Sequence, residues 1–150
     1  MLSTLPILTS SWRATIDPEF YCRVGISRGT PRGQEGFRRY GPLAPGPWWR
    51  DISDETEWVA AYESRVLGRL DPPRVVAELH AIAGNKVPVL MCWERPPPDP
   101  APCHRALVSR WIFREIGIEI PELGHEGLGH GNNHPKLSRI QRATCCCDLP

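Results

Sequence analysis

The fold is decided by residues 87–116, which read VPVLMCWERPPPDPAPCHRALVSRWIFREI. The nearly continuous apolar run over residues 87–92 lacks the alternation of a half-exposed strand, which indicates a strand covered on both faces. A proline-rich turn follows, and apolar residues then recur at helical spacing from Cys103 to Ile116, where Gly117 ends the pattern. The stretch therefore predicts a buried strand, a turn and an amphipathic helix.

Strands and helices also alternate before this stretch. Residues 20–27 predict an earlier core strand, in which Gly25 either weakens the strand locally or lets another backbone or a ligand come close. Residues 53–69 and 71–84 each carry apolar side chains at helical spacing, and Ser53 or Asp54 is the predicted N-cap of the first of these helices. Residues 118–120 are a candidate for a last strand. This alternation predicts a Rossmann-like α/β fold, namely one small, open, mostly parallel sheet flanked by helices.

The chain of 150 residues is long enough for one domain with a real core. We expect three parts. Residues 1–19 form an N-terminal arm or edge strand, residues 20–123 form the α/β domain, and residues 124–150 form a flexible tail rich in glycine, histidine and cysteine.

Composition excludes several classes of protein. The longest apolar run is only a few residues, which rules out a membrane span, and the N-terminus lacks the basic region of a signal peptide. We therefore expect a cytoplasmic protein. Six cysteines are present, but three are consecutive at residues 145–147 and the others are widely spaced, so reduced thiols are expected rather than a disulfide scaffold.

Residues 28–51 form a long segment rich in glycine and proline without a helical or strand period. Its aromatic side chains, Phe37, Tyr40, Trp48 and Trp49, argue against disorder. Between residues 28 and 50, five arginines stand against a single glutamate, which favours recognition of anions. We predict an ordered lid or active-site loop.

A candidate site follows from the ends of the two predicted core strands. Ser27 and Arg28 follow the first strand, and Cys92 and Glu94 end the second. In open parallel sheets, ligands bind beyond the carboxyl ends of the strands. The helix that begins near Cys103 would direct its free N–H groups to the same edge, which favours an anion.

Three arginines would complete a phosphate or carboxylate site in this interpretation. They are Arg28, Arg32 and Arg105, and Arg105 is the strongest single candidate for ligand contact. The expected partner is a nucleotide or nucleic acid, with no membrane partner. The oligomeric state is not predicted.

Each side chain that could carry chemistry also has a structural interpretation. Cys103 could be a reactive thiolate at a helix N-terminus or a small apolar residue that seals the turn. Glu94 could be a general base, a ligand to a ribose or amine, or a solvated loop acid. His104 could transfer protons or make a hydrogen bond at the helix end, and Cys92 is more often plain core.

A metal site is not predicted, and neither is a cofactor. Cys92 and Cys103 are eleven residues apart without a Cys-x-x-Cys pair, which is poor spacing for zinc. His125, His130 and His134 miss the HExxH pattern, and the glycines between them argue against a helix.

The pairing of VLMCWE with CHRALVSRWI resembles the family catalogued as domain of unknown function 488 (DUF 488). Its signature is an apolar strand that ends in Cys-x-Glu, a short loop, and Cys-His-Arg at the start of an apolar helix. The matching positions here are Cys92, Glu94, Cys103, His104 and Arg105. The resemblance spans roughly residues 20–123 and implies a compact α/β fold with a parallel sheet and no settled activity.

Two departures from the family are visible. Its members commonly carry an Ile-Gly-His-Ser-type first strand, whereas residues 24–27 read VGIS here, without histidine. The loop between Glu94 and Cys103 is also lengthened by five prolines. Both departures leave the position of the site unchanged but weaken any inherited role in proton transfer.

Three functional hypotheses follow. The first is an enzyme, or former enzyme, that acts on a phosphate-bearing substrate such as a nucleotide. The second is a non-enzymatic module in which residues 28–49 bind nucleic acid through phosphate contacts and stacking. The third is a purely structural network of cysteine, histidine and arginine that holds the helix against the sheet.

Overall fold

Four parallel strands form one open sheet in the order β1–β4–β2–β3. They are β1 (Leu8–Ser11), β2 (Tyr21–Gly25), β3 (Arg38–Arg39) and β4 (Val87–Cys92). The computed structural model describes residues 5–143. Its all-parallel sheet and its helices confirm the predicted single-domain α/β fold.

The helices are α1 (Glu55–Arg65), α2 (Pro72–Ala83), α3 (His104–Ile116) and the short α4 (Arg139–Ala143). The predicted cap of the first helix is present, because the Asp54 side chain accepts a hydrogen bond of 2.9 Å from the backbone N–H of Glu57. α3 ends where predicted, at Gly117, whose φ of 73° lies in the left-handed region.

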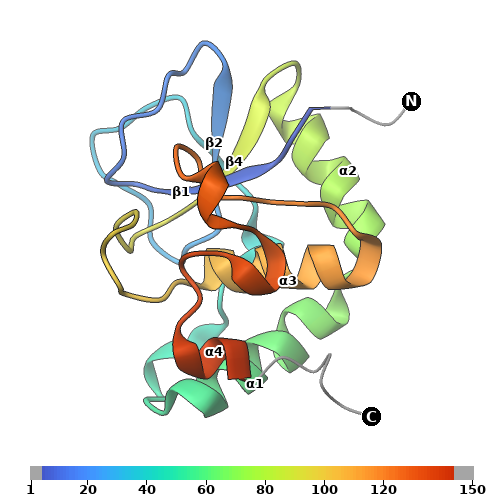
Figure 1. Ribbon diagram of the computed structural model, residues 1–150. Helices are drawn as coiled ribbons and strands as arrows, with labels where there is room; N and C mark the ends of the chain where they lie inside the picture. The colour runs from blue at the N-terminus through green and yellow to red at the C-terminus, as the bar shows by residue number, and fades with distance from the viewer. Residues whose placement is uncertain (1–4, 144–150) are drawn as a thin grey trace.

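The helices α1, α2 and α3 share one hydrophobic core with one face of the sheet (Figure 1). Val24 and Leu90 provide the sheet side of this core. A second, smaller cluster on the other face joins Val89 and Met91 to Trp12, which lies in the segment after β1. β4 is therefore buried on both faces, as its unbroken apolar run predicted.

Gly25 allows the second cluster to form. A Cβ atom at this position would lie 2.8 Å from the Trp12 ring, which is closer than such atoms approach. The glycine in β2 therefore admits a close neighbour, which is the Trp12 side chain and not the backbone or ligand that the sequence suggested.

β1 is an edge strand of this sheet, and it pairs with β4 from Leu8 to Ser11. Of the two alternatives for residues 1–19, an arm or an edge strand, residues 8–11 form an edge strand, while residues 1–4 lie outside the described part of the chain. Because β1 belongs to the same sheet as β2 and β4, the α/β unit begins before residue 20.

Residues 118–120 do not form a strand, and that prediction was wrong. The chain instead makes one parallel bridge slightly later, between Thr9 and Glu122. The backbone N–H of Thr9 donates to Pro121 O at 3.0 Å, and Leu123 N donates to Thr9 O at 2.9 Å. Pro121 has no N–H to donate, so the pairing is not extended into a regular ladder.

The C-terminal segment is packed against the domain, so the prediction of a flexible tail was wrong for residues 124–143. His134, Lys136, Leu137 and Gln141 are all buried, and α4 contacts α1 (Figure 1). Lys136 Nζ donates to the backbone carbonyl of Asp99 at 2.7 Å and lies 3.9 Å from the Asp99 carboxylate, which provides a partner for its charge. Residues 145–147, with their three cysteines, lie outside the described residues.

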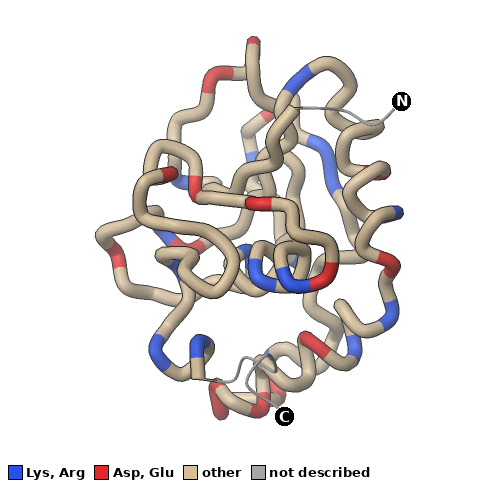
Figure 2. The backbone as a smooth tube through the Cα atoms, turned by 45° about the vertical axis from the view of Figure 1, so that its right-hand side comes forward, with Lys and Arg blue, Asp and Glu red and all other residues tan. Residues whose placement is uncertain are grey.

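Among residues 5–143, no helix is both long and apolar enough to cross a bilayer. Basic and acidic residues are interspersed along the backbone (Figure 2), in keeping with a formal net charge of +1. Residues 28–51, the arginine-rich segment before α1, therefore lie in a molecule that carries both signs of charge.

Candidate functional site

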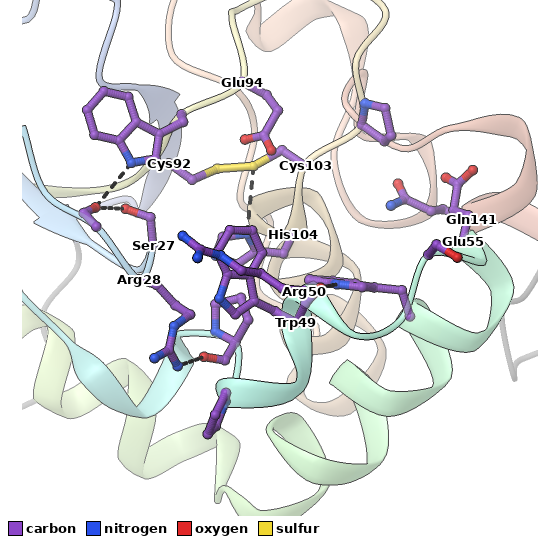
Figure 3. Close-up of a pocket in the computed structure, with 17 residues that line it drawn as sticks. Ser27, Arg28, Trp49, Arg50, Glu55, Cys92, Glu94, Cys103, His104 and Gln141 are labelled. Carbon is purple, nitrogen blue, oxygen red and sulfur yellow. Dashed lines mark hydrogen bonds between the residues drawn. A yellow bond between two sulfur atoms is a disulfide. The ribbon is translucent and has the colours of Figure 1, made fainter.

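A cleft of about 960 Å³ opens at the carboxyl ends of β2 and β4 and at the start of α3 (Figure 3). This is the edge of the sheet at which the sequence predicted a site. Six of the eight predicted site residues line the cleft, namely Ser27, Arg28, Cys92, Glu94, Cys103 and His104. The other two, Arg32 and Arg105, do not.

Cys92 and Cys103 are joined by a disulfide bond at the wall of the cleft (Figure 3). The expectation of reduced thiols was therefore wrong for this pair. The proline-rich turn brings the N-cap of α3 back to the end of β4, a proximity that the spacing of the two cysteines did not reveal. Among the described residues, Cys22 is the free cysteine, and it is buried away from this site.

His104 lies beside the disulfide with a defined orientation. Its Nε2 atom is 2.8 Å from Ile26 O, and a carbonyl can only accept, so Nε2 carries the proton. The unprotonated Nδ1 is 3.9 Å from Cys103 Sγ (Figure 3). Burial lowers the pKa of His104 to about 4, despite the hydrogen bond to Ile26, which raises it. The imidazole is therefore neutral at neutral pH.

Arg105 is fully buried, so the prediction that it contacts a ligand was wrong. Its Nε and Nη2 donate to the two carboxylate oxygens of Glu122 at 2.9 and 2.7 Å. Its Nη1 donates to Glu94 O at 2.9 Å and to Cys92 Sγ at 3.2 Å. Arg105 thus connects α3 to the end of β4 from behind the cleft wall.

Glu122 was not predicted as a site residue from the sequence. It is completely buried, and besides Arg105 it accepts a hydrogen bond of 2.7 Å from Thr9 Oγ1. A carboxylate without solvent requires such partners, and here they are complete. The only hint in the sequence is that this acid lies between apolar residues, Ile120 and Leu123.

His134 completes the network around Glu122. Its Nδ1 accepts the backbone N–H of Lys136 at 3.1 Å, and its Nε2 lies 2.7 Å from Thr9 Oγ1. Because Nδ1 accepts and Thr9 donates its hydroxyl proton to Glu122, His134 is neutral with the proton on Nε2. Burial lowers its pKa to about 3, and the nearby Arg105 and Lys136 act in the same direction.

Two guanidinium groups line the opening of the cleft. Arg28 is exposed and donates from Nη1 to Pro45 O at 3.1 Å. Arg50, which was not among the predicted site residues, lies over the Trp49 ring at 4.9 Å from its centroid. Arg32 is exposed outside the cleft lining, so the prediction that it shares this site is not supported by its position.

Three tryptophans also line the cleft, namely Trp49, Trp58 and Trp93. Trp93 Nε1 donates to Gly29 O at 3.1 Å, which connects the end of β4 to the segment after β2. Trp58 Nε1 donates to Trp49 O at 3.2 Å, which ties α1 to the arginine-rich segment. Trp49 and Trp93 are each more than a third exposed, so both residues are accessible to a ligand in the cleft.

Other polar residues of the cleft lining differ in the number of hydrogen bonds that they make within the protein. Ser27 Oγ donates to Gly29 O at 2.6 Å and accepts from Trp12 Nε1 at 3.0 Å, so it is a structural hydroxyl rather than a nucleophile. Glu94 is partly buried and lines the cleft with its side chain. Glu55 accepts a hydrogen bond from Ser138 Oγ.

Comparisons with protein-family models, with curated proteins and with solved structures found no match. The resemblance to DUF 488 therefore stays a prediction based on the C-x-E and C-H-R residues. In this chain, those residues form one junction in which Cys92, Glu94, Cys103 and His104 face the cleft and Arg105 lies behind it.

Proposed function

We propose that the cleft binds a small ligand with an aromatic ring and an anionic group, for which a nucleotide is the fitting chemical class. The observation that carries this proposal is the presence of two guanidinium groups, Arg28 and Arg50, and two accessible indole rings, Trp49 and Trp93, around one opening. Guanidinium groups favour phosphate, and indole faces favour planar bases.

The start of α3 supports the anionic part of the ligand. Cys103 occupies the N-cap of this helix without a side-chain capping bond, and both Cys103 and His104 line the cleft. The positive end of the helix dipole is therefore directed to the cleft, where it attracts negative charge. The cleft volume of about 960 Å³ lies within the usual range for small-ligand sites.

The acids of the lining narrow the choice of ligand. Glu94 and Glu55 contribute negative charge to the cleft, which disfavours a purely anionic molecule. A nucleotide suits this mixed lining, because its phosphate can approach the arginines while a ribose hydroxyl or base amine donates to Glu94. Glu94 thus keeps the ligand-binding role proposed from the sequence.

An extended nucleic-acid surface is less well supported. Several aromatic rings of the arginine-rich segment are used for packing within the protein. Phe37 lies edge-on to Trp12 at 5.2 Å, and Trp48 lies edge-on to Trp58 at 5.5 Å. Tyr40 is buried and donates its hydroxyl proton to Glu78 at 2.7 Å. These rings are not available as a row of stacking platforms for successive bases.

A titration of tryptophan fluorescence with AMP and ADP tests the proposal. The double variant Arg28→Ala/Arg50→Ala should bind at least about tenfold more weakly, because a hydrogen bond to a charged group contributes about 1.5–3 kcal/mol. The matched control is Arg32→Ala/Arg74→Ala, which removes the same charge from outside the cleft and should bind as the unmodified protein does. Equal weakening in both variants would refute the assignment to this cleft, as would no binding at millimolar nucleotide.

A further inference from the structure

Three metal-ligating atoms converge at the cleft wall, namely Cys92 Sγ, Cys103 Sγ and His104 Nδ1. All three lie within 4.8 Å of one another (Figure 3). We propose that, once the Cys92–Cys103 disulfide is reduced, these three atoms bind one divalent ion of the zinc class. This site goes beyond nucleotide binding and does not depend on it.

His104 is already prepared as a ligand. Its Nε2–H is held by Ile26 O at 2.8 Å, so the lone pair is on Nδ1, the nitrogen nearer the sulfur atoms. Metal-bound histidines usually donate their other ring N–H to a carbonyl or carboxylate in this way. The 3.9 Å from Nδ1 to Cys103 Sγ is close to the roughly 3.6 Å between ligands that Zn–N and Zn–S bond lengths imply for a tetrahedron.

Arg105 supports the sulfur of Cys92 from behind. Its Nη1 donates to that sulfur at 3.2 Å, and its position is fixed by the two hydrogen bonds to Glu122. The charges also balance, since two thiolates neutralise a divalent ion and Glu122 neutralises Arg105. A buried site with no net charge avoids most of the desolvation penalty that a bare dithiolate would incur.

The protein supplies three ligands, and all three residues line the cleft. A fourth, open position therefore faces the cleft, where water or a ligand anion can occupy it. Three protein ligands with an open position are typical of catalytic rather than purely structural zinc sites. Two cysteines and one histidine form one of the ligand sets known for such sites.

The disulfide and the metal exclude each other, because the metal binds both sulfurs as thiolates and in the disulfide these sulfurs are bonded to each other. A phosphine reductant supplies the two electrons that break the S–S bond and is itself oxidised to the phosphine oxide. Water supplies the oxygen of that product and the two protons of the resulting thiols. Binding of the ion then releases these two protons. The oxidised protein accordingly has no such site, and the redox state of one bond decides whether metal binds.

The test uses the full chain in which Cys145, Cys146 and Cys147 are replaced by serine, so that thiols outside the described residues do not compete. The protein is reduced with a phosphine, which is then removed without oxygen, and Zn²⁺ is titrated against a chromophoric chelator. We expect one equivalent bound after reduction and none in the oxidised form. Cys92→Ser should weaken binding by more than about 100-fold, because even changes around the ligands cost about 10- to 100-fold.

Cys22→Ser is the matched control, since this buried free cysteine lies outside the site, and zinc affinity should be unchanged. Circular dichroism checks that each variant is folded, and Cys103→Ser replaces Cys92→Ser if the latter is not. Co²⁺ gives an independent readout on the reduced protein, as tetrahedral thiolate coordination produces sulfur-to-cobalt charge-transfer and visible ligand-field bands. Absence of these bands, or zinc affinity unchanged by loss of either site cysteine, would overturn the proposal.

Discussion

Replacement of Glu122 by glutamine tests the contribution of the buried Arg105–Glu122 ion pair, which lies behind the cleft wall. Glu122→Gln keeps the shape of the side chain but leaves the Arg105 guanidinium without a counter-charge in a place where both side chains have 0% exposure. Breaking a buried pair by removing one partner costs about 3–5 kcal/mol. For a chain of 150 residues, this corresponds to a fall in Tm of roughly 6–20 °C.

Urea and thermal unfolding followed by circular dichroism measure this loss. The exposed pair Arg74–Glu78, at 3.8 Å on α2, provides the control. Arg74→Gln removes the cation of this pair and leaves the hydrogen bond from Tyr40 to Glu78 intact, so it should change the free energy of unfolding by less than about 1 kcal/mol. The double variant Arg105→Met/Glu122→Gln should recover much of the loss, because the unpaired charge is removed. A change below about 1 kcal/mol in Glu122→Gln would refute the view that Arg105 depends on this carboxylate.

Two further predictions concern packing and pH. Gly25→Ala should destabilise the protein by about 1–3 kcal/mol in urea unfolding, since its Cβ would lie 2.8 Å from the Trp12 ring. Gly41→Ala is the control and should be tolerated, because a Cβ there would meet nothing within 4 Å. Equal destabilisation by the two substitutions would contradict this explanation. The pKa values of His104 and His134 are lowered to about 4 and about 3 in the folded protein. As the pH falls below about 6.5, these histidines are therefore protonated in the unfolded chain while they are still neutral in the folded one. Stability should therefore fall from pH 6.5 towards pH 4, by up to about 1.4 kcal/mol per pH unit for each histidine, and a flat profile in His104→Gln/His134→Gln would confirm the source.

The sequence predicted those parts of the fold that depend on local pattern. β4, the turn and α3 follow from apolar spacing within one stretch, and the cap at Asp54 follows from the residue types in one helical turn. The edge at which the site lies was also predictable, because parallel strands that alternate with helices place their carboxyl ends together. These features need only neighbours along the chain.

The features that were missed depend on partners distant in sequence. An arginine before an apolar helix ordinarily points to solvent or ligand, and only the fold shows that Glu122 lies opposite Arg105. The packing of residues 124–143 has the same origin, since His134 and Lys136 are buried through contacts with Thr9 and Asp99 rather than through an apolar period. The spacing of apolar residues indicates which faces of helices and strands are buried, whereas buried polar networks leave little trace in that spacing.

The Arg105–Glu122 pair is better explained by the sulfur of Cys92 than by stability. A buried ion pair can often be replaced by apolar side chains of similar volume without loss of stability, so folding alone gives little reason to keep it. A guanidinium held 3.2 Å from Cys92 Sγ does what an apolar side chain cannot, because it stabilises negative charge on that sulfur. Such charge is absent from the disulfide and present in the thiolate and in its metal complex. The network that reaches from Thr9 through Glu122 to Arg105 therefore has its clearest chemical purpose when the disulfide is open.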